Sequence, residues 1–223
     1  MANMAKMAVL AVIITVLAGG CQKKIEKKAG EAAVSRNQER KAELLNRIEA
    51  KYENPQAHYE LGKLYQADGL WDKAEWHYNV ALGFDPIYRE AQAAIVKLLA
   101  ESGNSARSEL SAEIYINQAS TSAQASLRLG QAFQKELLDD YAMACYQQAL
   151  GMAPNSAAIH RQMGYYYLSK GDKVRAEEYL KRSFAIDPYQ AEVAGVLGQL
   201  GVVVQIPRKT EKDTTILDKI LNR

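Results

Sequence analysis

A period of 34 residues runs through most of this chain and restricts its fold more than any other feature of the sequence. One place in the period is taken in turn by Gly62, Val96, Gly130, Gly164 and Gly198. A fixed period of this length is typical of an array in which each repeat buries its apolar side only against its neighbours. Only 5 of the 223 residues are proline, and Ala, Leu, Glu, Lys and Gln are frequent, so the repeating unit is expected to be helical.

The residues around this place match the signature of a known pair of helices. They are His58, Leu61, Gly62, Tyr65, Ala74, Tyr78, Ala81 and Pro86 in the first copy, Leu129, Gly130, Phe133, Ala142, Tyr146, Ala149 and Pro154 in the third, and His160, Met163, Gly164, Tyr167, Ala176, Leu180 and Pro188 in the fourth. They resemble the tetratricopeptide-repeat (TPR) family. The resemblance implies an all-α fold, a TPR solenoid of antiparallel helix pairs with a C-terminal capping helix. The repeats are expected at residues 55–88, 89–122, 123–156 and 157–190, and the capping helix at 191–204.

The second copy departs from the signature but keeps its phase. Val96 replaces the glycine, Ser108 the packing alanine and Ser120 the closing proline. Because the copies on both sides stay in register, four stacked repeats are expected rather than two separated pairs.

Capping residues support the start of two repeats. Asn54 before Pro55 supplies a cap and an N1 proline at the start of the first. Thr121 and Gln124 have the spacing of a capping box at the start of the third.

The amino terminus has the character of a secretory signal. Residues 1–20 contain the single charge of Lys6, then an apolar stretch over Met7–Leu17, then small residues. This stretch is well short of the roughly 20 residues that a helix needs to cross the hydrocarbon core of a bilayer. We therefore expect residues 1–20 to be a cleaved signal peptide.

The small residues lead into a cysteine, and this sequence resembles the lipobox of bacterial lipoproteins. In that family the thiol of the first mature residue, here Cys21, carries the lipid. Ala18 stands where the family usually has leucine, so an ordinary signal peptide ending near a cysteine remains the alternative. Gln22 is not the Asp that favours retention in the inner membrane, so the resemblance implies an anchor in the outer membrane, facing the periplasm.

The segments outside the repeats are expected to be a tether and a tail. Residues 21–54 are expected to form a lipidated tether and a charged helix with an apolar stripe on the first repeat; the stripe is Leu44, Leu45, Ile48 and Tyr52. Lys23, Lys24, Lys27 and Lys28 follow the anchor, where they suit either anionic headgroups or a solvated tether. Residues 205–223 are expected to be a polar tail.

The sequence does not favour catalysis. His58 and His160 share a packing position of their repeats, and His77 and Cys145 occupy equivalent places two repeats apart, too far for a base and its nucleophile. No spacing of ligands suggests a metal site, and no motif suggests a cofactor or a small-molecule substrate. A formal net charge of +2 does not indicate a nucleic-acid partner.

The TPR resemblance implies a protein partner, a peptide or helix in the concave groove formed by the first helix of each repeat. The groove residues that it assigns are Gln56, Tyr59, Lys63, Gln66, Lys97, Gln131, Gln134, Lys135, Arg161 and Tyr165. Basic and amide side chains suit a partner's backbone and carboxylates. The alternative is that they are solvated helix faces.

Two functions compete at this point. The architecture of signal, lipid site and TPR array resembles the pilotin lipoproteins that assist a secretin of pilus or secretion systems, which implies a scaffold for an envelope machine. The alternative is an adaptor lipoprotein that docks peptidoglycan enzymes or proteases. The TPR signature specifies a fold and leaves this choice open.

Overall fold

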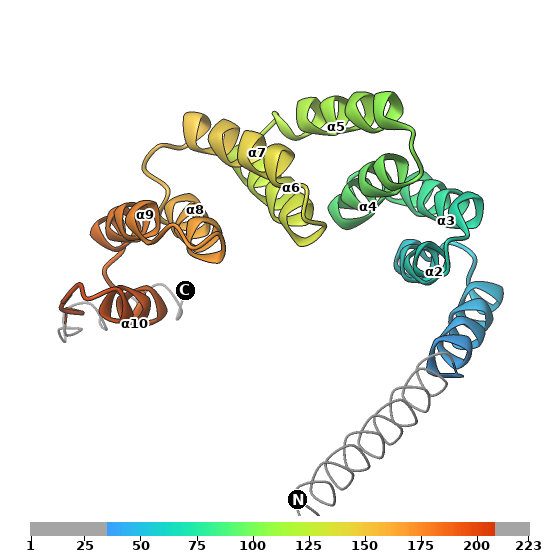
Figure 1. Ribbon diagram of the computed structural model, residues 1–223, viewed down its shortest axis with the longest axis horizontal. Helices are drawn as coiled ribbons and strands as arrows, with labels where there is room; N and C mark the ends of the chain where they lie inside the picture. Colours follow the sequence, from blue (N-terminus) through green and yellow to red (C-terminus); the bar gives the residue numbers. More distant parts are fainter. Residues whose placement is uncertain (1–34, 208–223) are drawn as a thin grey trace, which may run out of the picture. The chain divides into compact units, whose positions relative to one another are not determined.

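The computed structural model describes residues 35–207, and within this range the chain forms helices and turns without a strand (Figure 1). It divides into two compact units, Met1–Tyr88 and Arg89–Arg223. None of the helices between residues 35 and 207 has the length and apolarity that crossing a membrane requires. The predicted signal segment, Cys21 and residues 208–223 lie outside the described residues.

Unit 1 contains a helix over residues 35–50, α2 (Pro55–Ala67) and α3 (Trp71–Phe84). Unit 2 contains α4 (Arg89–Glu101), α5 (Ser105–Ala119), α6 (Ala123–Lys135), α7 (Asp139–Met152), α8 (Ala157–Ser169), α9 (Lys173–Ile186) and α10 (Ala191–Gln199). Each even-numbered helix from α2 to α8 packs against the next one, and in unit 2 the pairs also pack on one another. The expected all-α class of TPR helix pairs is confirmed.

The paired helices approach closely where the first helix carries the signature glycine. A Cβ atom added to Gly62 would lie 2.7 Å from the Tyr78 ring, and one on Gly130 would lie 2.6 Å from the Tyr146 ring. Real Cβ atoms do not make contacts this short, so glycine is required at both places. Each tyrosine fills the space that its glycine leaves.

The second pair reaches the same packing with the sizes reversed. At the two equivalent positions it has Val96 on α4 and Ala112 on α5, both fully buried in one core cluster. Ser108, in place of the packing alanine, donates a hydrogen bond of 2.8 Å to the Val96 carbonyl. The second copy, although it departs from the signature, therefore fills the same contact between its two helices with side chains of similar total volume.

One of the two predicted helix N-caps is confirmed. The Asn54 side chain accepts a hydrogen bond of 3.0 Å from the Ala57 N–H, with proline at the first turn. At the third pair the prediction was wrong by one residue: Ser122, not Thr121, caps α6 by accepting from Ala125 N–H at 3.1 Å. Ser122 has the extended backbone (φ −161°) typical of a cap.

The turn inside a pair requires a left-handed residue. Gly69, Gly103 and Gly171 have φ of 73°, 84° and 75°. The third pair has Leu137 at the equivalent place with φ 62°, where a Cβ makes the conformation costly.

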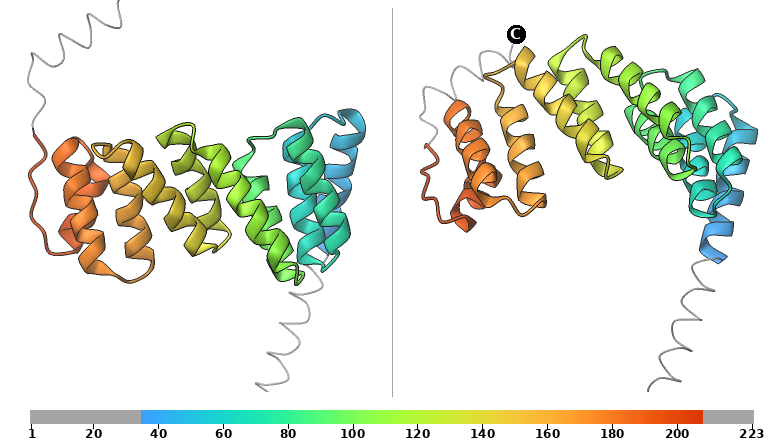
Figure 2. Two further views of the ribbon diagram at one scale, coloured as in Figure 1. Left: turned by 90° about the horizontal axis from the view of Figure 1, so that it is seen from above. Right: turned by 45° about the horizontal axis from the view of Figure 1, so that its top comes forward.

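The helix before the first pair packs through a different stripe from the expected one. Leu44 and Ile48 are buried against α2, but Leu45 and Tyr52 are 46% and 51% exposed. Figure 2 shows the helix over residues 35–50, in blue, beside the first helix pair. Lys41 completes the stripe, because its ammonium pairs with Asp68 just after α2. Because Lys41 is charged, the sequence did not indicate that it shares a buried stripe with Leu44 and Ile48.

The capping helix is shorter than expected. α10 packs on α9 but ends at Gln199, not at residue 204, because Gly201 turns the chain with φ 85°. Val202 and Val204 then return to pack on the cluster of Leu180, Val193 and Leu197.

Candidate functional site

Three glutamines from α6 and α8 form a hydrogen-bonded group on the surface of unit 2. Gln131 Nε2 donates to Gln162 Oε1 at 2.9 Å, and Gln162 Nε2 donates to Gln134 Oε1 at 3.0 Å. Together with Lys135 they line a hollow of about 450 Å³. The structure thus brings together three of the residues assigned to the groove.

Gln162 was missed by the sequence analysis. It lies one residue after Arg161 on α8, at a repeat position that the family register does not place in the groove. Gln162 stands at position 6 of its repeat, whereas Gln131 and Gln134 stand at positions 9 and 12 of theirs, so no spacing rule groups the three amides.

The hollow presents donors and acceptors suited to a peptide backbone. Gln134 lines the hollow and uses its carbonyl oxygen for Gln162 and for the Tyr146 hydroxyl, which donates to it at 2.5 Å, so neither bond uses its N–H groups. The Gln131 carbonyl oxygen is an acceptor beside them. The side chain of Lys135 is 70% exposed and lies 3.7 Å from Glu90, a surface pair worth at most about 1 kcal/mol. A partner's carboxylate can therefore replace Glu90 at little cost.

Lys97 is engaged within the protein. Its ammonium lies 3.2 Å from the carboxylate of Glu136, whose side chain is only 10% exposed. The glutamate comes directly after α6, 39 residues from Lys97. The expectation of an available cation is therefore corrected: removing Lys97 would leave a nearly buried carboxylate without this partner.

Arg161 and Tyr165 lie against the C-terminal cap. Arg161 donates to the Gln190 side chain at 3.3 Å, immediately before α10. Tyr165 is half-buried on the cluster that includes Val193, and burial together with the Glu192 carboxylate raises its pKa to about 12. Tyr165, which the resemblance assigns to the groove, therefore also packs on the C-terminal cap.

The groove residues of unit 1 have contacts of their own. The Tyr59 ring lies 5.2 Å from that of Tyr88, and the Lys63 ammonium lies 5.7 Å from the Tyr59 ring centre. Gln66 accepts a hydrogen bond of 2.7 Å from the Tyr78 hydroxyl. Gln66 therefore holds the core tyrosine of its pair, as Gln134 does in the third pair.

Gln56 also belongs to the residues assigned to the groove. Its amide donates to the Glu60 carboxylate at 3.0 Å, one turn later on α2. This exposed pair is the solvated helix face that the alternative interpretation describes.

A histidine pair lies buried between α2 and α3. His58 Nε2 lies 3.1 Å from the Tyr52 carbonyl oxygen and therefore donates to it, so the His58 Nδ1 accepts from His77 Nδ1 at 3.0 Å. Burial lowers the pKa of His58, and burial with the neighbouring His58 lowers the pKa of His77 to about 4. Both rings are neutral at pH 7.

The cysteine of the described chain is not suited to nucleophilic chemistry. Cys145 is fully buried in the core of unit 2, and burial raises the pKa of its thiol to about 12. Among residues 35–207 no three His, Cys, Asp or Glu side chains are placed to hold a metal ion.

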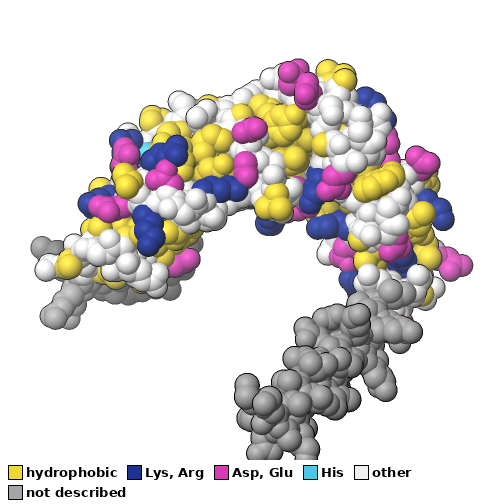
Figure 3. Space-filling view, viewed as in Figure 1, with side chains coloured by type: hydrophobic (Ala, Val, Ile, Leu, Met, Phe, Trp, Pro, Cys, Tyr) yellow, Lys and Arg dark blue, Asp and Glu magenta, His cyan; other side chains and the backbone are white. Residues whose placement is uncertain are grey.

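Unit 2 also exposes apolar side chains away from the hollow. On α5, Leu110 and Ile114 are 58% and 50% exposed, one turn apart. Apolar side chains gather over α5 and α7 in Figure 3. The exposed carboxylates of Glu109 and Glu113 flank these two side chains on α5.

No family model and no curated protein matches the chain. Among solved structures it is similar to a crystal structure of MamA protein, at 20% identity over 75% of this chain and 86% of that chain, with a TM-score of 0.39. It is similar to YrrB, described as a TPR protein with an unusual peptide-binding site, at 16% identity over 75% and 86% with a TM-score of 0.38. A third similar structure is that of PilF from Pseudomonas aeruginosa, at 20% identity over 66% and 67% with a TM-score of 0.37. Likenesses at this level carry no information about what this chain binds.

Proposed function

We propose that this protein is a lipid-anchored TPR scaffold that holds a protein partner at the amide hollow of unit 2. The observation that carries the proposal is the group of Gln131, Gln134, Gln162 and Lys135, which offers unused backbone-like donors and acceptors beside an exposed ammonium. Side-chain amides have the same donor and acceptor atoms as a peptide group. They pair with an extended segment without regard to its side chains.

The chemistry of the hollow defines the partner. An extended peptide would accept from the Gln134 amide and donate to the Gln131 carbonyl oxygen, with an acidic side chain or a carboxyl terminus on Lys135. A charge-assisted hydrogen bond is worth about 1.5–3 kcal/mol and a neutral one about 1 kcal/mol. These magnitudes favour modest affinity at the hollow.

The proposal also includes a membrane anchor and a role in an envelope machine. The apolar Met7–Leu17 stretch and the small residues before Cys21 support export and acylation. The signal, lipid site and repeat array support a scaffold in assembly of a pilus or secretion secretin. Replacing Cys21 by serine is expected to abolish palmitate labelling and to release the protein from membranes.

The test of the hollow is capture from detergent-solubilised membranes. Gln131→Ala with Lys135→Ala removes an acceptor and a charge while keeping Gln134, on which the buried Tyr146 hydroxyl depends. Partner recovery should fall by more than about tenfold, because the charge-assisted and the neutral hydrogen bond that are lost together exceed the roughly 1.4 kcal/mol that corresponds to a factor of ten. The matched control is Gln147→Ala with Lys173→Ala, an exposed amide and an exposed ammonium on α7 and α9.

The outcome separates the candidate functions. Recovery of a secretin or pilus proteins supports the envelope machine, and recovery of peptidoglycan hydrolases or proteases supports the adaptor. Equal recovery by the hollow variant and its control, with unchanged melting curves, would remove the hollow as the binding site.

A further inference from the structure

The turn between α2 and α3 exposes large apolar side chains at its tip. Leu70 is 43% exposed and Trp71 is 36% exposed. With Gly69, Asp72 and Lys73 they line a surface hollow of about 310 Å³. Exposed apolar groups gathered at one place mark a contact with a partner or a membrane.

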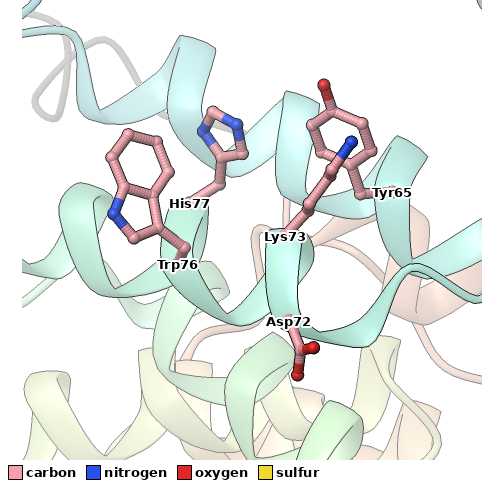
Figure 4. A pocket seen from close by; sticks show the side chains of 5 residues that line it. All are labelled: Tyr65, Asp72, Lys73, Trp76 and His77. Carbon is pink, nitrogen blue, oxygen red and sulfur yellow. The ribbon is translucent and has the colours of Figure 1, made fainter.

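A second hollow continues this surface along α3. It measures about 210 Å³ and is lined by Tyr65, Asp72, Lys73, Trp76 and His77. In Figure 4 the rings of Tyr65, Trp76 and His77 stand on one side, the Lys73 side chain reaches toward Tyr65, and Asp72 points away from them. The surface therefore presents aromatic rings and an ammonium together.

The apolar tip is particular to the first helix pair. The two residues at the equivalent turn positions are Asn104–Ser105, Leu138–Asp139 and Asp172–Lys173 in the other pairs. Only the first pair has two apolar residues, Leu70 and Trp71, at this place. The TPR turn itself therefore does not require them.

The tip lies at the end of unit 1 that leads to the anchor. The helix over residues 35–50 runs antiparallel to α2, because Lys41 pairs with Asp68 at one end while the Tyr52 ring lies 5.2 Å from His58 at the other. The α2–α3 turn is therefore on the side of residue 35. From there 14 residues lead back to Cys21, a span of at most about 50 Å when extended.

We propose that Leu70 and Trp71 at the α2–α3 turn contact the headgroup region of the bilayer in which the Cys21 lipid is anchored. The inference rests on the proposed lipid anchor and adds a second, noncovalent contact. Tryptophan favours the boundary between headgroups and hydrocarbon, where its ring is half apolar and half polar. Lys73 beside it, and Arg36 near the start of the described helix, can reach lipid phosphates while their stems stay on apolar surface.

The contact has a consequence for function. A single lipid leaves a tethered protein free to take any orientation, whereas a second contact at the turn fixes how unit 1 stands on the membrane. The free energy of the contact needs only to be small, because the anchor keeps the turn at high local concentration near the bilayer.

The test uses the full mature chain beginning at Cys21, coupled through that thiol to a maleimide-headgroup lipid in phosphatidylethanolamine and phosphatidylglycerol vesicles. Cys145 is buried with a pKa of about 12 and does not react. The coupling replaces the biological lipid, so the result does not depend on acylation in the cell, which palmitate labelling tests separately. Because the chain has two tryptophans, Trp76→Phe leaves Trp71 as the single tryptophan.

Brominated lipids in the vesicles then report whether Trp71 lies in the bilayer interface. We expect the Trp71 emission to shift to shorter wavelength and to lose most of its intensity, and Leu70→Ser to reverse much of this loss. The matched control places the single tryptophan at Ile87, which is 64% exposed beyond the far end of α3, in a chain with Trp71→Phe and Trp76→Phe.

Two results would overturn the proposal. One is a Trp71 emission that brominated lipids leave unchanged on the coupled vesicles, which would assign the tip to a protein partner. The other is equal quenching at position 87, which would show that the tethered protein contacts the bilayer without preference. Circular dichroism melting of each variant shows that it is folded.

Discussion

The contact between Gly130 and Tyr146 allows a quantitative test of how the helix pairs are specified. A Cβ on Gly130 would lie 2.6 Å from a ring carbon of Tyr146, whereas ordinary van der Waals contact begins at 3.4 Å. The ring would have to move by about 0.8 Å. It has no room to do so, because Tyr146 is fully buried and its hydroxyl is held by Gln134 and Gln162.

Gly130→Val is therefore expected to destabilise the protein by about 2 kcal/mol, the middle of the range for overpacking, against a gain of a few tenths from helix propensity. For a chain of this size that free energy lowers the melting temperature by about 4–8 °C. The control is Gly195→Val on α10, where an added Cβ meets nothing within 4 Å and no loss of stability is expected.

A double-mutant cycle identifies the cause. Tyr146→Ala alone should cost about 3–5 kcal/mol through the cavity it leaves. In that background Gly130→Val should cost almost nothing, because the pair then has the same composition as Val96 with Ala112. The expected coupling is about 1–3 kcal/mol, measured by urea unfolding. Additive effects of the two substitutions would refute the steric explanation.

Two further predictions concern stability. Leu137→Gly should raise the free energy of unfolding by about 1 kcal/mol, because Leu137 is 74% exposed with φ 62°. Val174→Gly, in a helix and 80% exposed, should instead lower it by about 0.4 kcal/mol, and thermal melting that gave both changes the same sign would contradict the argument. The free energy of unfolding should fall as pH drops from about 6.5 to 4, because the pKa of His77 is 6.5 in the unfolded chain but about 4 in the folded protein. The expected loss is about 3 kcal/mol. Urea unfolding across this pH range should show a smaller loss in His77→Phe.

The fold was predictable because its rules are local and steric. Each of these rules acts within one helix pair, so it can be recognised from residue spacing in the sequence. They are the 34-residue period, the glycines that leave room for a tyrosine and the glycines of the turns. The errors in the prediction arose at residues whose side chains can take more than one structural role. Lys41 interrupts an apolar stripe and still belongs to it, because its ammonium reaches Asp68.

The candidate site depends on tertiary contacts that residue spacing in the sequence does not predict. Register assigned Lys97 and Gln134 to a groove, but only the tertiary structure shows that Lys97 is paired with Glu136 and that Gln134 holds a core tyrosine while still facing a hollow. The reason is physical: a helix register fixes the direction in which a side chain points. What remains available for a partner depends on which long side chains meet across neighbouring pairs, and that is decided by distances of a few ångströms between residues far apart in the chain.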